Sequence, residues 1–238
     1  MPIAITELVS AWNNADQSTA YTQSVTTTAN DALLVVPYLT RHGTTSPGFT
    51  ASGGSLSWVE SIAEQIDGIT GVGAWTALAP TAGTFTLSLT PDGGVTAIGC
   101  GYSVMQVFGH DLSAPIADTA LGTTGNNAAT SATITMNALK DPNNAQIAFF
   151  AHRTNETQTP EGSPWVAGTQ RNGAGPNTGL GAHWLIAGSD LTATSSWATS
   201  ARWQGLALEI AVAPAAGPTQ LYVPLARRPH LGQMTGRA

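Results

Sequence analysis

The sequence predicts an all-β protein, an antiparallel β-sandwich of jelly-roll type with an extended C-terminal arm. Roughly ten short segments either alternate apolar and polar residues or form brief β-branched apolar runs. Turn residues (Gly, Pro, Asn and Asp) separate these segments. Charged residues make up only 9% of the chain, whereas long solvent-facing helices normally carry many charge pairs. An up-and-down barrel is the alternative architecture.

The first strands are predicted at residues 3–12, 21–28 and 32–40. The third of these segments is an apolar run suited to a buried strand. It contains Pro37, which has no N–H to donate, so we expect a bulge or a sheet edge there.

Residues 56–66, LSWVESIAEQI, leave the choice between strand and short helix open. Ser57 and Glu60 fit a helical capping box. Trp58 and Ile62 instead fit one face of a strand.

The longest strand is predicted within residues 95–111, VTAIGCGYSVMQVFGHD, and forms the centre of the sheet. Its large residues, among them Cys100 and Tyr102, share one face and are expected in the core. Segments 72–79 and 84–90 precede it across short Gly/Pro turns, which predicts a three-stranded meander.

Further strands are predicted at residues 131–139, 145–152, 181–187 and 200–212. Residues 153–180 show almost no periodicity over about 28 positions, and loops of that length are usually functional or disordered. The C-terminal segment after the linker PAAGP has no apolar core of its own. We therefore expect a sandwich domain at 1–213 and an extended arm at 214–238.

The distribution of charge excludes some partners. Residues 1–213 carry five basic and fourteen acidic residues, whereas 214–238 carry three arginines and no acid. A negative body disfavours nucleic acid as a partner. No apolar run approaches the roughly 20 residues needed to span a membrane, and no signal peptide is visible, so we expect synthesis in a cytoplasm and no membrane association. The single cysteine excludes an intrachain disulfide framework.

No catalytic or metal-binding motif stands out. The five histidines show no metal-ligand spacing with one another or with Cys100. Neither a nucleophile elbow nor a phosphate-binding loop occurs in its required context. Glu60 with Glu64, or Glu156 with Glu161, are the carboxylates a glycoside hydrolase would need, yet nothing distinguishes them from solvated acids. We expect no enzyme, no cofactor and no metal, with a hydrolase as the remote alternative.

Two tryptophans lie outside the segments predicted as strands. Trp165 falls within the long 153–180 segment, and Trp197 falls in the polar stretch TATSSWATS. Exposed aromatics are favoured at interfaces. Both residues are therefore candidates for receptor or subunit contact, and packing of Trp165 under its own loop is the alternative.

Several segments together resemble a known family. The segments are TTTANDALLVV, GGSLSWVE, GVGAWTALAPTAGTFTLSLT, VFGHD, QIAFFAHRT and WQGLALEIAVA. Their order over about residues 18–213 resembles the β-sandwich modules of virion proteins of tailed bacteriophages and prophages. The resemblance implies an accessory virion protein, made in the host cytoplasm, such as a head decoration, spike or tail-fibre-type component. It implies an oligomer with major capsid or tail proteins as partners, and no catalytic residues.

The arm is the predicted assembly interface. An extended strand or apolar plug from the arm would enter a neighbouring subunit, and two arginines would meet an acidic surface. A frayed terminus is the alternative. The residues concerned are Leu221, Tyr222, Val223, Leu225, Arg227 and Arg228. A second functional hypothesis is a host-attachment adhesin that binds a surface glycan through Trp165 and the 153–180 segment.

Overall fold

The computed structural model describes residues 2–13, 20–42, 48–65, 70–94, 96–123, 127–174 and 177–215. The described residues form seventeen β-strands and one short 3₁₀ helix, and the strands pair antiparallel. This confirms the all-β class. The strands of the first half are β1 (Ala4–Asn13), β2 (Tyr21–Thr27), β3 (Ala32–His42), β4 (Phe49–Ser52), β5 (Val59–Gln65), β6 (Thr70–Ala79), β7 (Gly83–Pro91) and β8 (Ala97–Phe108), with η1 (Asp92–Gly94) before β8.

The strands of the second half are β9 (Ile116–Thr123), β10 (Ala129–Thr135), β11 (Ala145–His152), β12 (Thr159–Pro160), β13 (Val166–Ala167), β14 (Arg171–Ala174), β15 (Asn177–Ile186), β16 (Thr192–Ala201) and β17 (Trp203–Ile210).

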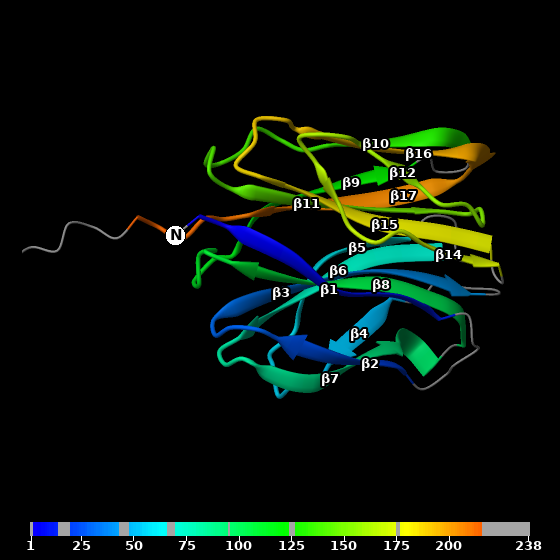
Figure 1. Ribbon diagram of the computed structural model, residues 1–238. Helices are drawn as coiled ribbons and strands as arrows, with labels where there is room; N and C mark the ends of the chain where they lie inside the picture. The colour runs from blue at the N-terminus through cyan, green and yellow to red at the C-terminus, as the bar shows by residue number, and fades with distance from the viewer. Residues whose placement is uncertain are drawn as a thin grey trace, which may run out of the picture.

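The strands form four sheets that stack as four layers (Figure 1). The two middle layers are the sheets β1-β8-β3-β6-β5 and β13-β15-β11-β17-β9, with β14 also paired to β15. The outer layers are β2-β7-β4 and β10-β16-β12. The predicted β-sandwich is thus confirmed as a class, and the described chain contains two sandwiches in tandem.

The two sandwiches have the same strand order. In the first, the large sheet runs first–eighth–third–sixth–fifth strand and the small sheet runs second–seventh–fourth. Counting from β9, and taking β13 and β14 together as the fifth strand, the second sandwich repeats both orders. Equivalent strands such as β3 (ALLVVPYLTRH) and β11 (AQIAFFAH) share burial rather than residues, so the repeat is not evident in the sequence.

The described residues form four hydrophobic clusters: a central core, two outer cores and a small cluster around Leu34 and Ala79. The central core joins the two large sheets and takes Val35 and Met105 from one, and Ile147 and Phe149 from the other. Each outer core lies between a large sheet and its small sheet. The central strands β3, β8, β11 and β17 are therefore buried on both faces, which explains their largely apolar sequences. Cys100 belongs to the first outer core and is fully buried, as predicted.

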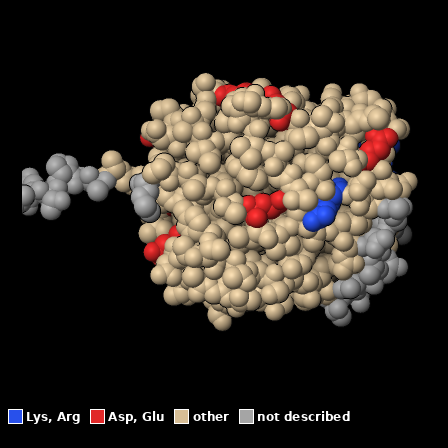
Figure 2. Space-filling view, in the orientation of Figure 1, with Lys and Arg blue, Asp and Glu red and all other residues tan. Residues whose placement is uncertain are grey.

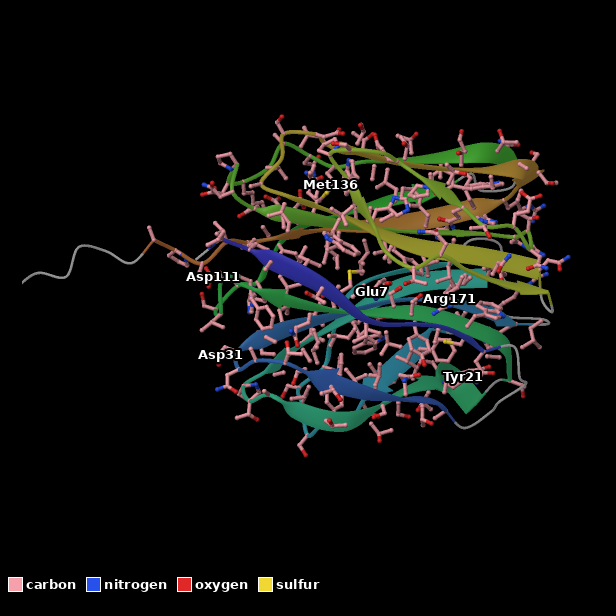
Figure 3. The ribbon with its side chains drawn as sticks, viewed as in Figure 1. Glu7, Tyr21, Asp31, Asp111, Met136 and Arg171 are labelled. Carbon is pink, nitrogen blue, oxygen red and sulfur yellow. The ribbon has the colours of Figure 1, made fainter. Side chains whose placement is uncertain are left out.

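Hydrogen bonds also tie the two sandwiches together along β1. The Glu7 carboxylate accepts a bond from the Thr169 backbone N–H at 2.7 Å, and the Arg171 side chain donates to the Ser10 carbonyl at 3.0 Å. Figure 3 places Glu7 and Arg171 close together beside the junction of the middle layers. Together with the central core, these bonds make the two sandwiches one unit.

Two predictions about the first half are wrong, and a third question is settled. Pro37 lies in β3, which is central between β6 and β8, and the register is the same on both sides of it. Pro37 keeps its position opposite Ala74 of β6, so the strand accommodates the missing donor without a bulge.

The predicted meander does not form either, because β7 lies in the outer sheet while β6 and β8 flank β3. Residues 59–65 form strand β5, which decides the open choice in favour of a strand.

The second half contains strands where loops were predicted. The 153–180 segment includes three short strands, β12, β13 and β14, and the stretch around Trp197 is strand β16. Strand β9 lies between residues 112 and 130, where no strand was predicted. Strands β12 and β13 lack an obvious apolar pattern because they expose most of their side chains. Main-chain pairing to β16 and β15 holds them in place.

Candidate docking surface

Both tryptophans proposed for contact are buried in the second outer core. Trp165 and Trp197 are each 5% exposed. The Trp165 indole N–H donates to the Asp190 carboxylate at 3.2 Å, and the Trp197 indole N–H donates to the Ala129 carbonyl at 3.0 Å. For Trp165, these contacts favour a role in packing over a role in receptor or subunit contact. Contact of either ring with a receptor or a subunit stays a prediction, and it would require the ring to be uncovered.

The predicted arm residues lie outside the described residues. They are Leu221, Tyr222, Val223, Leu225, Arg227 and Arg228. The structure describes the chain up to Ala215, and Pro214 and Ala215 are both exposed.

The described histidines are buried rather than arranged as a reactive site. Burial lowers the pKa of His152 and of His183 to about 4 in each case. Within the part of the chain that the structure describes, the ring nitrogens of His183 have no hydrogen-bond partner. Across the described ranges no three His, Cys, Asp or Glu side chains gather in a way that could hold a metal ion. Nor does any helix there have the length and apolar character to cross a membrane.

One acidic cluster was missed by sequence reasoning. Glu60 had been considered with Glu64, but its carboxylate accepts a hydrogen bond from the Tyr38 hydroxyl at 3.2 Å. Burial, with a smaller contribution from the charge of Asp92, raises the pKa of Glu60. Asp92 in turn accepts a bond from the Thr50 hydroxyl at 2.7 Å. Because Tyr38 is 1% exposed, we interpret this cluster as a polar link between β3, β5 and the end of β7.

An apolar groove with a volume of about 800 Å³ lies beside β6 and β7. Three of its lining residues are large hydrophobic side chains with unusual exposure: Val59 at 60%, Leu78 at 37% and Leu112 at 55%. Leu56 and Phe85 also line it. None of the described residues that line it is charged. Exposed apolar surface of this kind marks interaction sites.

Two strand edges border the groove. Strand β5 pairs with β6 only from Gly71 to Thr76. In the described chain, Ala77–Ala79 of β6 therefore form main-chain pairs with β3 alone. Strand β4 pairs with β7 only from Ser88 to Pro91, so the first residues of β7 pair only with β2 in the described chain. Each edge therefore offers main-chain groups to an added strand, although the β7 edge does so only before Thr86, whose carbonyl lies against Gly53.

A second pocket, of about 430 Å³, adjoins the groove where the chain leaves the body. It shares Leu112 and Ser113 with the groove and is also lined by Pro214. Asp31 and Asp111 line it as well, and Figure 3 shows both at this end of the molecule. Hydrogen bonds from Ser113 lower the pKa of Asp111, so its carboxylate is ionised at neutral pH.

Charges are sparse elsewhere on the face that Figure 2 shows, where acidic and basic side chains form only small separate patches. The surface offers no continuous basic area on this face. The apolar groove and the acidic pocket at its end thus distinguish this part of the body from the rest of the surface.

Comparison with known proteins found no match: no family model, no curated protein and no solved structure is similar to this chain.

Proposed function

We propose that the protein is a non-enzymatic structural component of a larger assembly, and specifically an accessory protein of a tailed-bacteriophage virion. The observation that carries this proposal is the apolar groove bordered by two unpaired strand edges. Natural proteins normally cover or charge such edges, because an open edge next to apolar surface recruits another chain. A groove left open in one chain is therefore a surface to be covered in an assembly.

The virion assignment is supported by the sequence resemblance over about residues 18–213. The strand order of each sandwich, with the first strand beside the eighth and the second beside the seventh, fits the proposed jelly-roll type. Head decoration, spike and tail-fibre-type roles all require a rigid body and a means of attachment. The stacked sandwiches would provide the body, and residues 214–238 would provide the attachment.

The test is incorporation into particles. The tagged chain is expressed in cells producing the phage that encodes it, and particles are purified on a density gradient. We expect the full chain to co-purify in a fixed number of copies per particle. A chain shortened after Ala215 should remain in the soluble fraction and be missing from particles. Absence of the full chain from particles would refute the virion assignment.

A further inference from the structure

We propose that the groove beside β6 and β7 binds residues 219–225 of the C-terminal arm of a second copy of this chain. This deepens the assembly role and rests on the function proposed above. Each copy would give its arm to one neighbour and receive an arm from another. Such a head-to-tail contact closes into a ring or continues as a filament, depending on the rotation between copies.

The pattern of the arm matches the groove. In an extended TQLYVPL segment, Leu221, Val223 and Leu225 would lie on one face, because side chains alternate along a strand. That face would cover the exposed side chains of Leu78 and Leu112. The main chain would add to a free edge of β6 or β7.

Pro224 is compatible with this arrangement. A strand added at an edge forms ladder bonds on one side only, so a proline whose nitrogen faces away from the receiving strand costs nothing. Prolines at 218 and 224 also favour an extended chain before binding, which lowers the entropy lost on docking.

The charges give the segment a direction. The groove lining and residues 219–226 are both uncharged, and Arg227 and Arg228 follow. If Leu225 lies at the Leu112 end, the two arginines reach the adjoining pocket that Asp31 and Asp111 line. Opposite charges would then meet at one end of the groove only, which fixes the register of the arm.

The path of the chain favours a neighbour over the same molecule. The described chain end leaves the body and runs away from the sheets (Figure 1). The PAAGP sequence that begins at Pro214 spans at most roughly 16 Å when fully extended. In the register set by the charges, residue 225 lies at the Leu112 end, where Pro214 leaves the body, and residue 219 lies roughly 20 Å further along the groove. That distance exceeds the reach of the five residues from Pro214, so this register favours the arm of a neighbour.

Disulfide trapping between two differently tagged full-length variants tests the proposal. One variant carries Leu78→Cys in the groove, and the other carries Val223→Cys in the arm. The native Cys100 is fully buried and should not interfere. After mixing and mild oxidation, we expect a disulfide-linked heterodimer in a yield about tenfold above a collision control, because docking holds the two thiols together.

The collision control replaces Leu78→Cys with Val166→Cys. Val166 is also an exposed apolar residue, at 48%, but it lies in β13 of the other sandwich. A heterodimer no more abundant than this control would overturn the proposal. A double variant that cross-links only within one chain would also overturn it, since the arm would then occupy its own groove.

A second measurement guards against misleading effects of the introduced thiols. Leu78→Arg should convert the full-length protein from an oligomer to a monomer in light scattering, while Val166→Arg should leave the oligomer intact. A wild-type monomer, or an oligomer unaffected by Leu78→Arg, would contradict the exchange. All these experiments use purified protein without particles, so they can fail or succeed independently of the virion assignment.

Discussion

The imidazole of His152 stacks on the indole of Trp197, with ring centroids 4.4 Å apart and an interplanar angle of 23°. Gly179 lies opposite His152 in the neighbouring strand, and a Cβ there would come within 2.4 Å of the imidazole. The ring is therefore enclosed between an indole and a bare backbone. Sequence reasoning had expected Trp197 in a polar loop, and the structure makes it the cover of a buried histidine.

This enclosure predicts acid sensitivity. The pKa of His152 and of His183 falls from 6.5 to about 4 on folding, so the unfolded chain binds more protons between these pH values. Above pH 6.5, each neutral imidazole makes its full contribution to the free energy of unfolding. This contribution is lost as the pH falls towards about 4. The full loss is about 3 kcal/mol per histidine. Urea unfolding at a series of pH values should show this decline.

His152→Gln serves as the matched variant for the acid experiment. It should lower stability at neutral pH and reduce the slope between pH 6.5 and 4, since one titrating group is gone. The exposed carboxylates Asp111 and Glu156 have lowered pKa values and lose their contributions at still lower pH. A slope unchanged by His152→Gln would contradict the assignment.

Gly101→Ala should destabilise the protein by about 2 kcal/mol through overpacking. A Cβ at Gly101 would lie 1.9 Å from Leu180 of the facing sheet and 2.6 Å from the Trp12 ring. Gly83→Ala is the control, because no atom lies within 4 Å of a Cβ at that position. Thermal unfolding of the two variants should separate them clearly. Equal melting temperatures would show that the close approach of the sheets at Gly101 is not restrictive.

Cys100 should be inert to thiol reagents in the native protein. Its side chain is fully buried, and burial raises the pKa of the thiol. Little thiolate forms at neutral pH, and access is blocked. An aromatic disulfide reagent should react with one thiol per chain only after denaturant is added. Rapid labelling without denaturant would mean that the first outer core opens readily.

Neither sandwich should fold when expressed alone. Residues 1–113 would expose Leu33, Val35 and Leu39, and residues 114–215 would expose Ile147 and Phe149, all members of the central core. Each fragment should aggregate or bind a hydrophobic dye without a cooperative unfolding transition. Co-expression of the two fragments should restore a soluble complex. A single fragment that unfolds cooperatively would show that the 1–213 region contains two independent domains.

The sequence by itself determined the class of the fold and the strands with strong apolar patterns. Strand β3 was predicted from a continuous apolar run, and β8 and β17 from the alternation of side chains along the strand; β11 was predicted as a strand as well. Cys100 was assigned to the core because it shares one face of its strand with other large residues. These are local signals, and each depends only on neighbours along the chain.

Only the tertiary structure decided how these strands are shared among sheets. The tandem arrangement, the central position of Pro37 and the crossing of β7 into the outer sheet depend on long-range pairing that local patterns do not encode. The burial of Trp165 and Trp197 depends on polar strands held by main-chain bonds, which leave no apolar periodicity. The groove, too, exists only because β4 and β5 stop short of the ends of β7 and β6, leaving edges that the sequence could not reveal.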